Sequence, residues 1–205
     1  MALFVAVDVP AGVRRRVSAA LPAVQTAAPH LRFAAAASWH VTLAFLGRVE
    51  PGARPALVGA LAGVCVGRPA FDVGLDGRAA TFGGRVLWAA FEPCPALRSL
   101  ATAVRSATRA ALAGAGGTQC GQPPAQQPHD EAFTAHLTLA RTPRGGARVP
   151  PAAIAAYDGP KAAWRVTAVQ LLSSTGRSAG AAYTVEGEWP LGGSAPSDGA
   201  AQPAP

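Results

Sequence analysis

The chain has 205 residues, enough for one large domain or two small lobes that bury a core of their own. Half of the residues are hydrophobic, but 49 are alanine, so the mean hydropathy of +0.22 reflects small side chains. No stretch of the sequence approaches the roughly 18 consecutive strongly apolar residues of a membrane-spanning helix. Composition therefore excludes membrane-spanning, collagen-like and coiled-coil proteins.

Arginine supplies nearly all of the positive charge. Lys and Arg number 18 against 11 Asp and Glu, which gives a net charge of +7, and Lys161 is the only lysine. A GC-rich coding bias would explain both the excess of arginine and the high Ala, Gly and Pro content. Alternatively, the arginines serve a function, because guanidinium groups suit phosphate ligands such as RNA or nucleotides. The cysteines at 65, 94 and 120 form no CxxC pair. We therefore expect no disulfide framework, no metal site, no cofactor and a cytoplasmic location.

Hydrophobic periodicity predicts strands and helices in alternation along the first half of the chain. The helix near the N-terminus contains Pro22, which we expect to kink or end it. Gly83 and Gly84 predict a turn between two strands. The predicted elements are strand 3–9, helix 11–27, strand 38–47, helix 52–65, strands 69–76 and 85–92, and helix 95–113.

The second half of the chain is richer in strands. It begins with a Gly-, Pro- and Gln-rich loop, and a last hairpin turns through Gly176–Gly180. Because several strands follow one another directly, we expect an α+β fold rather than a doubly wound sheet, in one bilobal domain over 1–191. The predicted elements are loop 114–128, strand 133–141, helix 151–157, strands 164–174 and 182–190, and a disordered tail over 192–205.

A five-residue repeat is the strongest internal signal. The run beginning at His40, His-Val-Thr-Leu-Ala, recurs from His136 as His-Leu-Thr-Leu-Ala, 96 residues later. Each copy lies in a strand-like run, and these are two of only four histidines in the chain. The other two, His30 and His129, have no matching context, so we interpret them as surface or loop residues.

The period of a strand determines which side chains of the repeat share a face. His40 and Thr42 project together, and Val41, Leu43 and Phe45 are expected to project into a core. In the second copy His136 and Thr138 share a face, with Leu137 and Leu139 on the core side. Two lobes related by a pseudo-twofold axis would bring the two imidazole–hydroxyl pairs face to face across a cleft.

Two imidazoles on opposite sides of one ligand can divide acid and base work. The unperturbed pKa of histidine lies near neutrality, so one ring can accept a proton while the other donates one. The two threonine hydroxyls can donate to phosphate oxygens. This arrangement suits in-line hydrolysis of a phosphodiester by water without a metal. The G-x-S-x-G sequence at 176–180 lacks the strand-to-helix context of a nucleophile elbow, and we find no phosphate-binding loop of an ATP-driven ligase.

The motifs resemble those of the bacterial RNA 2′,3′-cyclic phosphodiesterase family, historically called 2′-5′ RNA ligases, in the two-histidine (2H) phosphoesterase superfamily. The resemblance covers most of residues 3–191. The segment Trp39–Gly47 is similar to the family motif H-x-T-L-x-F-L-G, and Phe133–Arg141 is similar to H-x-T-L-A-R. The chain departs from the family at Ala135, where Pro is usual, and in a long polar loop over 114–132.

The resemblance implies a fold, an activity and residue roles. It implies a bilobal α+β fold with two pseudo-symmetric antiparallel sheets, acting as a monomer on RNA or a nucleotide with a 2′,3′-cyclic phosphate and releasing a 2′-phosphate. By motif position, His40 would be the proton donor, His136 the proton acceptor, and Thr42 and Thr138 phosphate ligands. Arg141 would join them only if a bulge or the strand end turns it onto the face of His136.

Two other functions stay open at this point. One is a 2H phosphoesterase that acts on a different substrate, such as a small cyclic-phosphate metabolite or a 2′-5′ linkage. The other is a non-catalytic module that binds RNA ends. Ligation of 2′-5′ bonds by the reverse reaction is also possible in principle, because the same two proton transfers run backwards.

Overall fold

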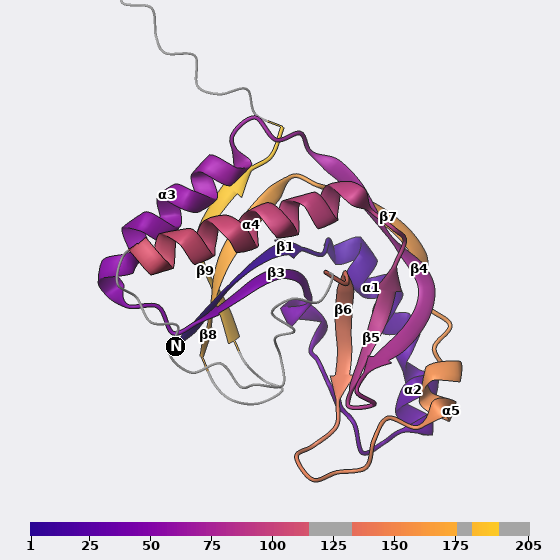
Figure 1. Cartoon of the computed structure of the whole chain (residues 1–205). Helices are drawn as coiled ribbons and strands as arrows, with labels where there is room; N and C mark the ends of the chain where they lie inside the picture. Colours follow the sequence, from indigo (N-terminus) through magenta and orange to yellow (C-terminus); the bar gives the residue numbers. More distant parts are fainter. Residues whose placement is uncertain (115–132, 176–181, 193–205) are drawn as a thin grey trace, which may run out of the picture.

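The structure, a computed structural model, describes residues 1–114, 133–175 and 182–192, and has an α+β fold with two antiparallel sheets (Figure 1). The predicted fold class is confirmed. The four-stranded sheet has the order β3 (His40–Gly47), β1 (Ala2–Asp8), β8 (Ala168–Thr175) and β9 (Ala182–Pro190). The five-stranded sheet has the order β2 (Arg32–Phe33), β6 (His136–Arg141), β5 (Val86–Phe91), β4 (Phe71–Phe82) and β7 (Lys161–Val166).

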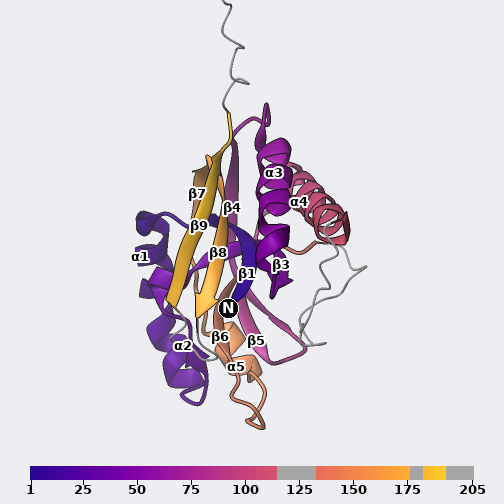
Figure 2. The same ribbon diagram turned by 90° about the vertical axis from the view of Figure 1, so that its left-hand side faces the viewer.

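Two groups of helices cover the sheets. Helices α3 (Arg54–Cys65) and α4 (Pro95–Gly114) pack together and against strands of the four-stranded sheet. Helices α1 (Ala11–Ala19), α2 (Leu21–Ala27) and α5 (Pro151–Ala155) pack beside β4 and β7 of the other sheet, and Figure 2 shows the two groups on different sides of the molecule. Short 3₁₀ turns lie at η1 (Ala36–Ser38) and η2 (Pro51–Ala53). One hydrophobic cluster runs through both sheets.

The chain passes directly from one sheet to the other at two places. Residues of β2 pair with β6 in the five-stranded sheet, and the chain then runs through η1 into β3 of the four-stranded sheet. Later, β7 pairs with β4, and after Thr167 the next strand, β8, pairs with β1. These crossings hold the two sheets next to each other.

Several predicted boundaries were wrong. The predicted strand 164–174 is two strands, β7 and β8, which belong to different sheets. This stretch contains no Gly or Pro, so the sequence gives no sign of such a crossing. The predicted strand 133–141 begins only at His136, and the strand expected at 69–76 continues to Phe82. The helix predicted over 11–27 does break, as expected from Pro22: α1 ends at Ala19 and α2 begins at Leu21. Pro22 lies in the first turn of α2, where its missing N–H costs no hydrogen bond.

Three predicted segments lie outside the described residues: most of the loop 114–128, the loop at 176–180 and the tail beyond residue 192. Within the part of the chain that the structure describes, no helix has the length and apolar character needed to cross a membrane.

Candidate active site

The two histidines of the repeat begin strands that lie side by side although they belong to different sheets. β3 forms the edge of the four-stranded sheet and contacts β6 of the other sheet (Figure 1). The His136 ring contributes to the lowered pKa of His40, so the two imidazoles are within electrostatic range of each other. Both rings and both threonines, Thr42 and Thr138, are half-buried. The structure therefore brings the two histidine strands next to each other.

Each copy of the repeat contains a β-bulge at its fourth residue, which is Leu43 in the first copy and Leu139 in the second. In the first copy the register against β1 skips Leu43, and in the second copy the register against β5 skips Leu139. An extra residue reverses the alternation beyond it. Phe45 therefore joins the face of His40, where it packs against Phe4, and the prediction that Phe45 shares the face of Val41 and Leu43 was wrong.

Arg141 is the counterpart of Phe45 in the second copy, and the same bulge brings it onto the face of His136. It also lies close to the other sheet, because its charge lowers the pKa of His40 as well as that of His136. Burial lowers the pKa of Arg141, and Tyr183 of β9 partly offsets this effect. The positive charge of Arg141 thus acts on both imidazoles.

The two imidazoles have the same orientation and the same tautomer. Nδ1 of His40 lies 2.8 Å from the carbonyl oxygen of Ser38, and Nδ1 of His136 lies 2.9 Å from that of Thr134. A carbonyl oxygen can only accept, so Nδ1 donates in both cases. In each neutral ring Nε2 therefore carries the lone pair, and it is the atom that can take up or give a proton.

Aromatic rings surround each histidine. His40 lies against Phe4, with ring centroids 4.7 Å apart, and against the edge of Tyr183 at 5.2 Å. His136 lies 4.9 Å from Phe82, which stacks on Trp88. Phe82 and Tyr183 are 38% and 37% exposed, so a ligand can reach these two aromatic rings.

This apolar lining disfavours the charged form of both imidazoles. Burial is the main cause that lowers the pKa of His40 to about 4, with smaller contributions from the positive charges of Arg14 and Arg141. Burial also lowers the pKa of His136, and Arg141 and Arg105 add to the effect. Both rings are therefore neutral at pH 7 in the ligand-free protein.

Sequence reasoning missed two arginines that support the histidine strands. Arg14 of α1 bonds to Asp8 and donates to the carbonyl oxygens of Ala36 and Ala37, at 3.3 and 2.7 Å, in the turn that precedes His40. Arg105 of α4 donates to the carbonyl oxygen of the bulged Leu43 at 2.8 Å. No sequence signal marks either residue, because neither belongs to the repeat and the chain has 17 arginines.

The Arg105 guanidinium also lies 5.2 Å from the ring of Phe133, which precedes the second copy of the repeat. One side chain of α4 therefore contacts both histidine segments. Of the two remaining histidines, His30 is exposed, and His129 lies outside the described residues. In the described part of the chain, no three His, Cys, Asp or Glu side chains are grouped so as to bind a metal ion.

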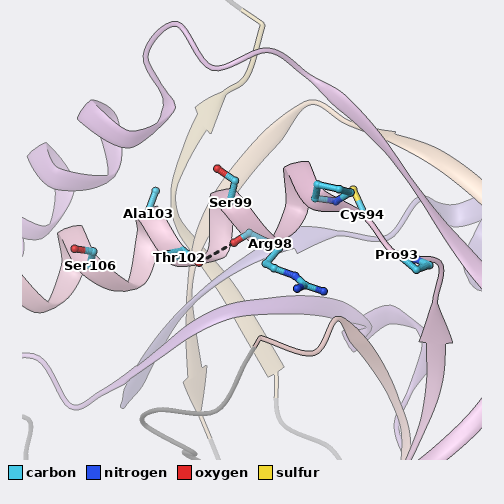
Figure 3. Close-up of a pocket in the computed structure, with 8 residues that line it drawn as sticks. Pro93, Cys94, Arg98, Ser99, Thr102, Ala103 and Ser106 are labelled. Carbon is cyan, nitrogen blue, oxygen red and sulfur yellow. Dashed lines mark hydrogen bonds between the residues drawn. The ribbon is translucent and has the colours of Figure 1, made fainter.

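A cavity of about 610 Å³ lies away from these residues, along the first half of α4 (Figure 3). Its lining includes Cys94, Arg98 and Ser99, and the Thr102 hydroxyl beside it donates to the carbonyl oxygen of Arg98. None of the predicted site residues lines it. It offers no pair of acid–base groups, so we place the candidate active site at the two histidines instead.

Comparison with known proteins identifies the family of the chain. Residues 13–178 match the 2′-5′ RNA ligase superfamily. The structure of LigT from Escherichia coli in complex with 3′-AMP is 27% identical, with a TM-score of 0.67, and the match covers 93% of this chain and 97% of that one. A protein of Thermus thermophilus is 26% identical with a TM-score of 0.72, over 94% and 99% of the two chains.

A third solved structure, described as a phosphoesterase, is 30% identical with a TM-score of 0.64, over 93% of this chain and 98% of that one. A comparison with curated protein sequences gives no significant match. E. coli LigT has also been crystallised with NADP⁺, with ATP and with phosphate. The family match spans well over half of the sequence, and the chain belongs to the 2′-5′ RNA ligase superfamily of 2H phosphoesterases.

Proposed function

We propose that the chain hydrolyses 2′,3′-cyclic phosphate ends of RNA or nucleotides to 2′-phosphates, with His40 and His136 as the acid–base pair and without a metal. The observation that carries the proposal is the matched pair of imidazoles. Both hold Nδ1 on a backbone carbonyl, and both leave Nε2 as the atom that exchanges protons. Such symmetry is expected where two groups act on opposite sides of one phosphorus atom.

In the proposed reaction His136 accepts a proton from water while the water oxygen forms a bond to phosphorus. The bond between phosphorus and the 3′ oxygen breaks, and protonated His40 gives its proton to that oxygen. The product is a 2′-phosphate with a free 3′-hydroxyl. The assignment of donor and acceptor follows the family motifs, since burial lowers the pKa of both rings and does not by itself divide the roles.

The substrate itself supplies the charge that the donor needs. A phosphodiester carries a negative charge, and a negative charge beside an imidazole raises its pKa. Binding therefore favours uptake of a proton by one ring of a pair that is neutral in the free protein. Thr42, Thr138 and Arg141 stand on the histidine face as donors to the non-bridging oxygens, where charge develops in the transition state.

The exposed aromatic rings suit a nucleoside on the reacting phosphate. Phe82 and Tyr183 flank the two histidines and can stack on a base. The indole N–H of Trp88 has no acceptor among the described residues and lies opposite Thr138 in the ladder. The nucleotides bound by E. coli LigT agree with a nucleotide ligand. They also keep a small cyclic-phosphate nucleotide as the second candidate substrate.

The test is turnover of 2′,3′-cyclic mononucleotides by protein dialysed against a chelator, with the product isomer identified by phosphorus NMR. We expect a 2′-phosphate, and losses of at least about 10²-fold for His40→Ala and for His136→Ala. The exposed His30 provides the matched control, and His30→Ala should keep full activity. A 3′-phosphate product, a requirement for added metal, or near-normal turnover by either site variant would contradict the proposal.

A further inference from the structure

The two histidine strands belong to different sheets, so their separation depends on contacts other than strand pairing. Within a sheet, ladder hydrogen bonds hold neighbouring strands about 4.8 Å apart. β3 pairs with β1, whereas β6 pairs with β2 and β5. None of the ladders in the described residues therefore joins the strand of His40 to the strand of His136, and other bonds must fix the distance between the two imidazoles.

The bulge of the second copy supplies one such bond. The carbonyl oxygen of Leu139 accepts from the backbone N–H of Ala34 at 2.8 Å. Ala34 follows β2 and belongs to the segment that leads through η1 into His40. The second copy of the repeat is therefore bonded, backbone to backbone, to the segment that precedes the histidine of the first copy.

The bulge of the first copy is linked to the other histidine through a side chain. The carbonyl oxygen of Leu43 accepts from Nε of Arg105 at 2.8 Å. The guanidinium carbon of Arg105 lies over the ring of Phe133, 5.2 Å from its centre. The next residue is Thr134, whose carbonyl oxygen accepts the Nδ1–H of His136. Arg105 thus joins the first bulge to the segment that positions the second imidazole.

The base of the Arg105 side chain is held in a firmly packed part of α4. The helix has 20 residues, and Val104 and Thr108 beside Arg105 are buried. The Thr108 hydroxyl donates to the carbonyl oxygen of Val104 at 2.8 Å. α4 packs against both α3 and β3. Because its base is fixed, the side chain can hold the two segments that its tip contacts at a constant distance.

The guanidinium keeps its charge in this half-buried position. Burial lowers the pKa of Arg105, and the charge of Arg109, one helical turn further along, adds to the effect. The usual pKa of arginine lies so far above neutrality that the group stays protonated. A permanent cation is attracted to the face of an aromatic ring, and Nε remains available to a carbonyl oxygen. Arg105 can therefore make both contacts at once.

We propose that Arg105 is a positioning residue that sets the separation of the two imidazoles by linking the bulge at Leu43 to the segment before His136. The backbone bond between Ala34 and Leu139 serves the same purpose for the other copy. The inference rests on the proposed function, because the separation matters for rate where one phosphate must meet both rings. A small misplacement of a reacting group lowers the rate far more than it lowers binding.

Three substitutions break this link at different points. Arg105→Gln keeps a nitrogen donor at the position of Nε and loses the guanidinium over Phe133. Arg105→Lys keeps a positive charge at the position of the guanidinium carbon and has a methylene in place of Nε. Arg105→Met has a stem of similar length and makes neither contact. The matched control is Arg109→Met, which removes an exposed arginine from the same helix.

kcat and KM are measured for each protein on a 2′,3′-cyclic mononucleotide. A link broken at either end is lost entirely, so we expect all three Arg105 variants to lose at least about 10-fold in kcat by similar amounts. KM should change by less than about twofold, and Arg109→Met should behave as the unchanged protein. Near-normal kcat in Arg105→Gln or in Arg105→Lys would show that one contact is enough, and would overturn the inference.

Urea unfolding separates a positioning role from general support of the fold. The kinetics are measured where each variant is fully folded. A lowered free energy of unfolding in Arg105→Met together with an unchanged kcat would overturn the inference. If Arg105→Met does not fold, the two milder variants decide: equal losses of kcat in Arg105→Gln and Arg105→Lys support the link, and unequal losses contradict it.

Binding of inorganic phosphate gives a readout that needs no turnover. A titration followed on the imidazole nitrogen signals gives a dissociation constant for each histidine. In the unchanged protein we expect one shared constant for His40 and His136, because one phosphate meets both rings, and in Arg105→Met two different constants. Two constants in the unchanged protein, or a shared constant in Arg105→Met, would overturn the inference.

The phosphate titration also keeps this test apart from that of the proposed function. An unchanged protein that binds phosphate through both imidazoles but does not hydrolyse the cyclic mononucleotide would contradict the proposed function, and the titration of Arg105→Met would then decide the role of Arg105 alone. Normal hydrolysis by all three Arg105 variants would instead overturn the positioning role and leave the proposed function in place.

Discussion

Leu43 and Leu139 occupy the same position in the two copies of the repeat, and each forms a bulge in its strand. The bulges bring the next but one residue of each copy onto the histidine face: Phe45 in the first copy and Arg141 in the second. Two nearly identical sequences thus place different side chains on the histidine face of their strands, an apolar ring in the first copy and a guanidinium in the second. Such asymmetry is what two rings with opposite tasks require.

This asymmetry predicts a specific role for Arg141. If the guanidinium stabilises charge on the phosphate oxygens, Arg141→Ala should lower kcat/KM on a 2′,3′-cyclic mononucleotide by about 10²-fold, because one preformed donor is lost. Arg141→Lys should recover part of this loss, since the charge returns without the planar fork. Steady-state kinetics measure both values, with Arg48→Ala as the control for loss of one exposed arginine. Unchanged kinetics in Arg141→Ala would remove Arg141 from the site.

The lowered pKa values of both histidines predict an acidic pH optimum. At pH 7 the free protein holds both rings neutral, so the protonated donor is a minor species. Its population grows as the pH falls, until the acceptor is protonated as well. We therefore expect kcat/KM to rise as the pH is lowered from 8 toward 6, with its maximum below 6.5. A kcat/KM profile with its maximum at or above pH 7 would contradict this description of the site.

The same shift predicts sensitivity of the fold to acid. The pKa of His40 is about 4 in the folded protein against 6.5 for an ordinary histidine, so between these values the unfolded chain binds more protons than the native one. The free energy of unfolding contributed by neutral His40 is fully present above pH 6.5. It is lost as the pH falls toward 4, by about 3 kcal/mol at 1.36 kcal/mol per unit.

Urea unfolding at pH 7, 5.5 and 4.5 measures this effect. His40→Gln, which has no titrating ring, should lose less stability between pH 7 and 4.5 than the unchanged protein. The exposed His30 is the control, because His30→Gln should follow the unchanged protein at each pH. If all three proteins lose stability in parallel, the pKa of His40 is not lowered in the folded state.

Arg14 is predicted to act on catalysis through His40 rather than through the substrate. It holds the carbonyl groups of Ala36 and Ala37, and the next residue, Ser38, accepts the Nδ1–H of His40. Arg14→Lys should therefore lower kcat by about 10- to 100-fold with little change in KM, since a misplaced group loses rate more than affinity.

A nitrogen NMR spectrum of His40 distinguishes this positioning role from a general loss of stability. In Arg14→Lys the fraction of the Nδ1–H tautomer should fall. Arg15→Lys, the next and exposed residue of the same helix, should change neither the spectrum nor kcat. A His40 spectrum that stays unchanged while kcat falls would show that Arg14 acts in some other way.

The repeat made the site predictable because it is local. The residue types, their spacing and the two-residue period of a strand were enough to pair His40 with Thr42 and His136 with Thr138. Periodicity was also enough for the long helix α4 and for the break at Pro22, where proline chemistry acts on the chain next to it.

The remaining features depend on tertiary pairing. The bulges at Leu43 and Leu139 exist only relative to β1 and β5, so strict alternation placed Phe45 on the wrong face. The sequence around Thr167 likewise does not reveal that the chain passes from one sheet to the other, because the crossing is defined only by the different strands with which β7 and β8 pair. Arg14 reaches a turn more than 20 residues away along the chain, a contact for which sequence spacing gives no rule.

The division of labour between His40 and His136 is the central claim, and replacement of the leaving oxygen tests it most directly. A substrate whose bridging 3′ oxygen is sulfur needs no proton on its leaving group, because a thiolate leaves unprotonated. The rates of His40→Ala and His136→Ala are measured on the oxygen and the sulfur substrate. We expect sulfur to restore most of the activity of His40→Ala and none of that of His136→Ala, whereas rescue of His136→Ala alone would reverse the roles and contradict the account.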